Sequence, residues 1–358
     1  MIRFTVQRML GAALTIVAAT FVAFALLRLT PGDPARMILG RFAPEEAVDA
    51  QRTRMRLDDS IAEQYWAYVA DFFRGDWGFS YSKGQPVREA FSARLPATIE
   101  LGLLAMAVAV IAAVVGAVIA VRFQGRWPDL LVRISSYLGI GTAPFWLGIV
   151  LLVVLSDRLG LLPGPEGRLT PWLDPPPRVT GSYLIDSVLA GDFVAFGDAL
   201  THLILPTLTL ALGLYAFLVR IFRAQLLEVV REPYVLVARS KGATRGRALR
   251  RDALPNSMLG AVTLVGTVVG EVLIFTVLAE KVFAWPGVGL LVTEAIVNQD
   301  FAIVQTFILF SVVSTVAISL VVDLLYGMLD PRVRAASWKR RARPGSTTMS
   351  AAIEESVR

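Results

Sequence analysis

The chain has 358 residues, of which 55% are hydrophobic and 18% charged, with a mean hydropathy of +0.60. Soluble domains average about 45–50% apolar and about 25% charged residues, so this composition indicates a membrane protein. The sequence has no cysteine and a single histidine, His202. This excludes disulfide frameworks and thiolate catalysis, and it argues against a His-cluster metal site or a Ser-His-Asp triad. The formal net charge of +6 suits arginines gathered on one side of a membrane better than a nucleic-acid partner.

Six segments are long and apolar enough to cross a bilayer, which needs roughly 20 apolar residues per helix. The first exceeds the apolar stretch of about 7–15 residues in a signal peptide. It also ends at Leu27-Arg28 without a small-residue cleavage site, which favours an uncleaved span. The predicted spans are 9–27, 99–121, 134–156, 202–222, 257–279 and 303–328.

The arginine-rich segments between these spans all fall on the side of the N-terminus. They are 122–133, 223–256 and the tail after 328, whereas 157–201 carries six acidic residues against three arginines. The positive-inside rule then places both termini in the cytoplasm. We therefore expect an all-α membrane protein with six transmembrane helices, both termini cytoplasmic, and a small external subdomain between helices 1 and 2.

The chain divides into a first span with its N-terminus (1–29), an external segment (30–98), a transmembrane domain (99–334) and a tail (335–358). In the external segment, aromatic and apolar residues recur at helical spacing between Tyr65 and Phe73, which predicts an amphipathic helix. The proline-rich stretch 163–181 predicts irregular structure. The tail is basic and then rich in Ser and Thr, which predicts disorder.

Few residues inside the predicted spans carry chemistry. Glu271 is a possible pathway residue, although it could equally cap a neighbouring helix or face a water-filled cavity. Gly266 and Gly270 match a small-xxx-small pattern. The favoured interpretation of this pattern is ordinary helix packing. No convergent nucleophile and base or metal set supports an intramembrane enzyme, so we expect no catalytic residue, cofactor or metal site.

None of the four lysines is followed by Ser or Thr, so the phosphate-cradling loop of ATPases is absent in its usual form. Any ATPase that energises this chain must be a separate subunit.

Residues 224–256, between the fourth and fifth spans, are predicted to form a helix–turn–helix. The stretch AQLLEVVREPYVLVARSK (224–241) is typical of a helix with a break near Pro233, and Gly242 ends it. RGRALRRDA (245–253) predicts a second, short basic helix. Because proline is tolerated in the first turn of a helix, the fifth span can begin near Pro255.

The spacing of this segment resembles the coupling motif of ABC-importer permeases, EAA-x3-G-x9-I-x-L-P. Ala238, Gly242 and the pair Leu254-Pro255 match the motif, whereas Leu236, Val237 and Asp252 depart from it. Other stretches resemble the dipeptide/oligopeptide/nickel permease family, over residues 1–334 in all. They include LRLTPGDPA (27–35), RLPATIELGLLA (94–105), VARSKGA (237–243), EKVFAWPGVG (280–289) and VDLLYGMLDPRVR (322–334).

The resemblance implies the first permease of a pair in an ATP-driven importer of dipeptides or oligopeptides, located in the bacterial cytoplasmic (inner) membrane. Its implied partners are a second homologous permease, one or two ATPase subunits that hold ATP and Mg, and an extracytoplasmic solute-binding protein, with no nucleic acid. The implied ATPase-coupling residues are Ala238, Arg239, Ser240, Lys241, Gly242, Ala243, Leu254 and Pro255. A nickel chelate, an opine or glutathione as the solute, or a six-span channel, are the alternative interpretations.

Overall fold

The computed structural model consists almost wholly of helices and describes residues 2–28, 34–39 and 42–329. Within these helices, some side chains, including those of residues 259–264, 267 and 271, lie outside the described part. The predicted tail 335–358 also lies outside it. In chain order the elements are α1 (Ile2–Arg28), α2 (Pro34–Leu39), α3 (Glu45–Arg54), α4 (Ile61–Arg74), β1 (Phe79–Ser80), β2 (Gln85–Pro86), α5 (Val87–Arg122), α6 (Trp127–Gly141), α7 (Pro144–Leu151), the π-helical segment η1 (Leu152–Arg158), α8 (Tyr183–Ala190), α9 (Phe193–Val230), α10 (Pro233–Ser240), α11 (Arg245–Ala248), the π-helical turn η2 (Leu249–Ala253), α12 (Leu254–Val282), α13 (Val288–Val297) and α14 (Phe301–Leu329).

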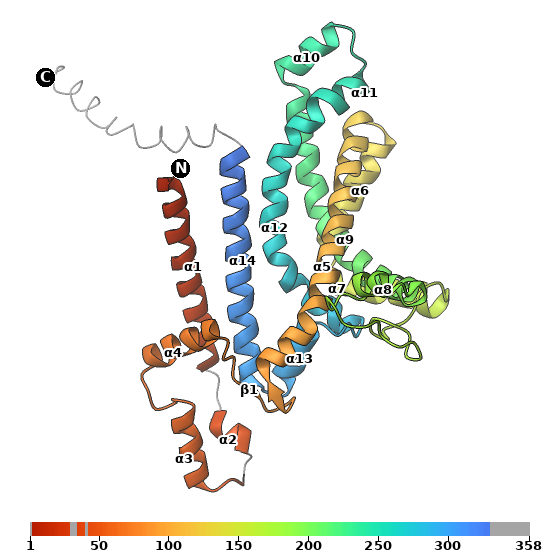
Figure 1. Ribbon diagram of the computed structural model, residues 1–358. Coiled ribbons are helices and arrows are strands. Elements are labelled where there is room, and N and C mark those ends of the chain that lie inside the picture. Colours follow the sequence, from red (N-terminus) through yellow and green to blue (C-terminus); the bar gives the residue numbers. More distant parts are fainter. Residues whose placement is uncertain (1, 29–33, 40–41, 330–358) are drawn as a thin grey trace, which may run out of the picture.

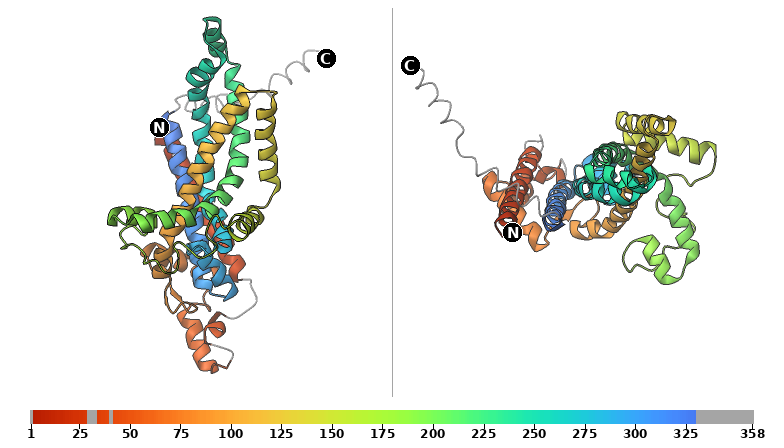
Figure 2. Two further views of the ribbon diagram at one scale, coloured as in Figure 1. Left: turned by 90° about the vertical axis from the view of Figure 1, so that its right-hand side faces the viewer. Right: turned by 90° about the horizontal axis from the view of Figure 1, so that it is seen from above.

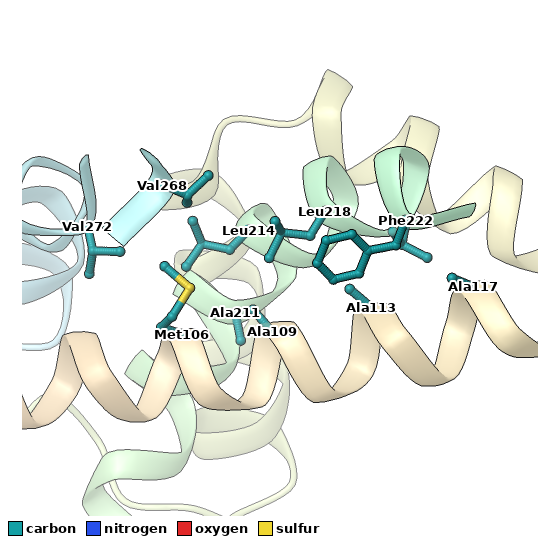
Figure 3. Packing of buried hydrophobic residues seen from close by; sticks show 11 residues of the cluster. Met106, Ala109, Ala113, Ala117, Ala211, Leu214, Leu218, Phe222, Val268 and Val272 are labelled. Atoms are coloured by element: carbon teal, nitrogen blue, oxygen red, sulfur yellow. The ribbon is translucent and has the colours of Figure 1, made fainter. Parts of the chain in front are cut away.

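Two long helices, α5 and α9, form the centre of the bundle. Alanines recur on α5 at a spacing of four residues, which puts them on one face of the helix. Because these side chains are small, the leucines of α9 and Phe222 pack closely against them, and α12 adds two valines (Figure 3). The buried cluster comprises Met106, Ala109, Ala113, Ala117, Ala211, Leu214, Leu218, Val219, Phe222, Val268 and Val272.

The opposite face of α5 is apolar but exposed. Its residues also recur every four positions, from Ile99 to Ile119. Twenty residues of helix extend about 30 Å, the thickness of the hydrocarbon core of a bilayer. An apolar stripe of this length is typical of a helix that faces lipid or another transmembrane helix. The stripe consists of Ile99, Leu103, Ala107, Ile111, Val115 and Ile119.

The helices form two groups joined by α12. Figures 1 and 2 show α1 and α14 side by side at one flank, and α6 with α5 and α9 at the other. α12 packs against both α9 and α14. Its contact with α14 is close at Gly270, where the Thr315 hydroxyl donates to the backbone oxygen at 2.7 Å, and at Gly266, which faces Val322. The helix-packing role predicted for these two glycines is confirmed.

Four described helical segments are long and apolar enough to cross a membrane: Thr5–Leu26, Val87–Arg122, Phe193–Val230 and Phe301–Val322. Val87–Arg122 and Phe193–Val230 contain the second and fourth predicted spans, and Thr5–Leu26 and Phe301–Val322 cover most of the first and sixth. α12 contains the fifth and is 29 residues long, but the undescribed side chains in its middle leave that span a prediction.

The predicted third span, 134–156, is not one continuous helix. α6 and the pair α7–η1 meet at an angle of 106° and count as a fifth span only if taken together. The break lies at Thr142 and Ala143, which have extended backbones. The cause is Pro144, because a proline disfavours the helical conformation of the residue before it.

We call the end of the bundle that carries α10 and α11 the α10 end, and the opposite end, which carries α13, the α13 end (Figure 1). The start of α1 and the last described turn of α14 both lie at the α10 end.

The segment between α1 and α5 forms a small module at the α13 end. The amphipathic helix predicted there is present as α4, which begins with a capping box between Ser60 and Glu63 and ends at Gly75, with φ +84°. The Tyr65 and Thr20 hydroxyls share a buried hydrogen bond of 2.8 Å, which fixes α4 on α1. β1 and β2 form a short antiparallel hairpin.

Residues 159–182 contain no helix or strand, as predicted for 163–181, yet buried charged groups fix this loop in place. Arg168 forms an ion pair of 2.5 Å with Glu100, and both side chains are buried. The Arg168 guanidinium also lies 3.6 Å from the centre of the Tyr183 ring. Asp186, buried at the start of α8, accepts hydrogen bonds from the backbone N–H groups of Val179, Thr180 and Gly181.

Candidate functional site

The segment predicted as a helix–turn–helix stands at the extreme of the α10 end (Figure 1). α9 continues to Val230, and α10 begins at Pro233, so the predicted break near this proline is confirmed. Pro233 is in the first turn of α10, where its missing N–H leaves no bond unmade. Together, α10, α11 and η2 form a projecting element, which we call the tip.

Gly242 ends α10 with a paired-bond turn. The Gly242 N–H donates to the Arg239 carbonyl at 3.0 Å, and the Ala243 N–H donates to the Ala238 carbonyl at 3.2 Å. This is the Schellman arrangement, which requires a left-handed residue at the glycine position. Gly242 has φ +93°, and the space around it is open. The glycine is therefore required by backbone conformation and not by close contact.

The second half of the tip joins α12 without a break. Thr244 caps α11 by accepting from the Arg247 N–H at 3.3 Å. Leu249 and Leu254 both have helical dihedral angles, so α11, η2 and α12 follow one another directly. The short basic helix was predicted to reach Leu254-Pro255, where the fifth span begins, and α12 begins at Leu254 as predicted. The wider π-helical turn before Pro255 accommodates the proline, which has no N–H and crowds the preceding turn.

The tip is held on the bundle by a small apolar cluster. Val235 of α10 is 1% exposed and lies among residues from the ends of α5 and α9. The Arg245 guanidinium donates to the Val121 carbonyl at 3.2 Å, which joins α11 to the end of α5. A motion of the tip therefore reaches three long helices, α5, α9 and α12. The buried members of the cluster are Val121, Leu226, Val235, Ala248, Leu249 and Ala253.

The structure brings the predicted coupling residues together on this tip and on the first turn of α12. The side chains of Arg239, Ser240, Lys241 and Pro255 are exposed, as is Gly242, whereas Ala238, Ala243 and Leu254 are half-buried.

The exposed face of α10 is also apolar, which sequence reasoning did not anticipate. Tyr234 is 45% exposed, Leu236 47% and Val237 51%. Leu236 and Val237 occupy the positions at which the coupling motif has a glutamate and an alanine. In this chain the surface at that point is therefore apolar where the motif is charged. The departure from the motif was the signal that could have identified this face.

The possible pathway residue Glu271 belongs to α12, but its side chain lies outside the described part of the chain. Its backbone is in the same turn as Val269, Val272 and Leu273. Its role stays a prediction.

A buried acid that the sequence did not single out lies further along α12. Glu280 has no exposed surface. Its carboxylate accepts from the Thr98 hydroxyl at 2.7 Å and from the Leu290 N–H at 2.9 Å. Thr98 in turn accepts from the Val288 N–H at 2.8 Å. This network fixes α5, α12 and α13 to one another at the α13 end.

At the other end, Asp129 of α6 accepts two bonds from the Arg223 guanidinium of α9, at 2.9 and 3.2 Å. It also accepts from the Gly125 N–H at 3.0 Å. The α5–α6 turn is therefore fixed against α9 two helical turns before that helix ends.

The chain matches two family models that together cover most of its length. One describes the binding-protein-dependent transport system inner membrane component and matches residues 112–335. The other describes the N-terminal part of such a membrane component and matches residues 1–102. The chain belongs to this family and is a multi-pass permease of the inner membrane.

Its relatives narrow the class. The chain is 39% identical to the probable D,D-dipeptide transport system permease protein of Escherichia coli K12, over 91% of this chain and 96% of the relative. It is 37% identical to the di/tripeptide transport system permease protein of Pseudomonas aeruginosa UCBPP-PA14, over 92% and 98%. It is 30% identical to the glutathione transport system permease protein of Escherichia coli O1:K1, over 93% and 99%. The chain is thus a dipeptide-family ABC permease, and the resemblance seen in its motifs is confirmed. These relatives are transport permeases and not enzymes.

Proposed function

We propose that this chain is the first of two permeases in an ATP-driven importer of dipeptides or oligopeptides. It forms half of the translocation pore, and its tip transmits the motion of an ATPase subunit to the membrane helices. The names of the relatives support the substrate class. The exposed tip is the observation that supports the coupling role, because it combines a rigid turn, an apolar face and direct continuity with α12.

The proposed orientation follows from charge. The α10 end carries the exposed cations Arg239, Lys241 and Arg247, so it faces the cytoplasm under the positive-inside rule. Six spans and two cytoplasmic termini are part of this proposal. A second permease, one or two ATPase subunits with ATP and Mg, and an external solute-binding protein complete the importer. Glutathione is a second candidate solute, because one relative carries that name.

The apolar face of α10 suits a docking contact for the ATPase. Protein interfaces gain most of their energy from a few buried apolar or aromatic residues, and a ring of polar residues surrounds them. Tyr234, Leu236 and Val237 form such a centre, and Arg239 and Lys241 lie beside it.

The test is the recovery of the ATPase with the tagged permease, co-expressed with its partner subunits. Leu236→Glu places a charge in the proposed contact and is expected to lower the recovered ATPase on the order of tenfold. Leu161→Glu is the matched control, because Leu161 is 68% exposed in the loop at the α13 end. It is expected to recover the ATPase as the unsubstituted permease does. Full recovery and full uptake with Leu236→Glu contradict the coupling proposal.

A further inference from the structure

A cavity of about 280 Å³ lies between α5, α12 and α14. Among the described residues that line it none is charged, and only Thr98 and Ser314 are polar. Met106 and Val272 form part of its floor and also belong to the buried cluster in Figure 3. Small-ligand pockets measure about 300–1,000 Å³, so this cavity suits a single apolar group and not a whole ligand.

The Thr98 hydroxyl at one side of the cavity already has hydrogen-bond partners within the protein. The Thr98 hydroxyl donates to Glu280 at 2.7 Å and accepts from the Val288 N–H at 2.8 Å. Its only donor proton is therefore already used, so it cannot donate to a polar ligand, and the network to which it belongs backs the cavity toward the α13 end. A charged or amide group placed here would lose its hydrogen bonds to water without replacement, which is unfavourable.

The mouth of the cavity lies between helices that make little contact with each other. α5 and α12 meet closely at Gly102, where an added Cβ would lie 2.9 Å from Val272. α14, in contrast, packs mainly against α12 and α1 and only weakly against α5. Ile99 and Leu103, which are 44% and 62% exposed, border the mouth from α5. The opening can therefore widen without breaking the contact between α5 and α12.

The position of the cavity favours a transported group. Its lining comes from α5 in one helix group, from α14 in the other and from α12, which joins the two groups. On α12 it is lined by Val269, Val272 and Leu273, the turn that also contains the predicted pathway residue Glu271. The apolar stripe of α5 continues to Ile119, but only its residues Ile99 and Leu103 line the cavity, which therefore suits one apolar group and not a whole helix.

Resting on the proposed function, we propose that this cavity receives an apolar side chain of the peptide as it passes through the permease. A chain with such a pocket favours peptides with bulky aliphatic or aromatic residues over peptides of alanine or glycine. The preference adds to any selection by the solute-binding protein.

The experiment measures uptake of dileucine and of dialanine by the complete transporter in membrane vesicles, with the solute-binding protein added in saturating amount. Leu103→Trp fills the mouth and is expected to lower the dileucine-to-dialanine ratio on the order of fivefold. A single methylene group in a hydrophobic pocket already discriminates by about 10–200-fold. Ile99→Trp fills the mouth from the next turn and is expected to lower the same ratio. Ile111→Trp is the matched control, because Ile111 is 64% exposed on the same stripe of α5 but does not line the cavity.

Each outcome supports or contradicts the proposal. A lower ratio for both cavity variants and an unchanged ratio for Ile111→Trp support it. An unchanged ratio, or an equal loss of both peptides, overturns it and assigns the cavity to packing, lipid or the second permease. Failure of the unsubstituted transporter to import either peptide contradicts the proposed function itself, so the two failures are distinct.

Discussion

At the residue scale, Gly242 and Gly246 form a natural pair for testing how the tip works. Both have open space where a Cβ would be added, but only Gly242 has a positive φ. Gly242→Ala is therefore expected to strain the turn by about 1–2 kcal/mol, and to lower the uptake per ATP hydrolysed. Gly246→Ala, inside α11, is expected to stabilise that helix by up to about 1 kcal/mol and to leave coupling unchanged. Equal coupling in the two variants would show that the turn at Gly242 has no role in it.

Individual residues of the site also differ in how far the sequence predicts their roles. Gly242 was predictable because a left-handed turn depends on a few adjacent residues, and glycine adopts it without steric cost. The bond between Thr98 and Glu280 joins residues 182 positions apart, so no local pattern indicates it. The departure of Leu236 and Val237 from the coupling motif indicated apolar residues, but it did not show that their side chains are exposed. Their exposure depends on which face of α10 packs on α9, and eight residues give too short a pattern to decide that.

At the element scale, long helices with uniform apolar composition were predicted well, and interruptions within them were not. The four spans that the structure bears out lie within the single helices α1, α5, α9 and α14, and each of these helices is longer than the predicted segment. The third predicted span is broken because Thr142 and Ala143 have extended backbones before Pro144, although hydropathy continues across the break. The start of the fifth span near Pro255 was predicted correctly, but the π-helical turn that joins α11 to α12 without a break was not predicted.

The turn at the start of α8 gives a prediction about acid sensitivity. Burial alone raises the pKa of Asp186, but the hydrogen bonds from Thr180, Gly181 and Val179 outweigh it and hold the pKa below its ordinary value. Because the pKa of this carboxyl is lower in the folded turn than in the unfolded chain, the ionised form stabilises the folded turn. This stabilisation is complete at pH values above the unfolded pKa of about 3.9 and is lost as the pH falls through the folded pKa. We therefore expect protease cleavage within 163–181 to increase in strongly acidic solution.

Asp186→Asn is expected to raise this cleavage at neutral pH and to remove most of its acid dependence, since no carboxylate remains to be protonated. Asp174→Asn changes an exposed aspartate of the same loop and should cleave as the unsubstituted protein does. The measurement is the rate of limited proteolysis of the solubilised permease from pH 7 downward. A cleavage rate in Asp186→Asn equal to that of the unsubstituted protein at every pH would contradict the assignment.

At the scale of the whole molecule, the sequence predicted the class of protein and its helical bundle, but not the arrangement of helices. Gly266 and Gly270 indicated a close contact without naming α14 as the partner, because small residues permit an approach from any apolar neighbour. The cavity between α5, α12 and α14 depends on that arrangement. It could not be predicted, since each of its walls is an ordinary apolar helix face.

The proposed orientation can be tested across the whole molecule because the chain contains no cysteine. Single cysteines can therefore be introduced without background labelling, at the exposed positions Gln7, Asp174 and Ser240. In intact spheroplasts, a membrane-impermeant maleimide is expected to label Asp174→Cys and to spare Gln7→Cys and Ser240→Cys. Permeabilised cells are expected to show labelling at all three, which confirms that each site is reactive. Labelling of Ser240→Cys in intact spheroplasts would place the tip outside, where no ATPase can reach it, and would contradict both the orientation and the coupling role.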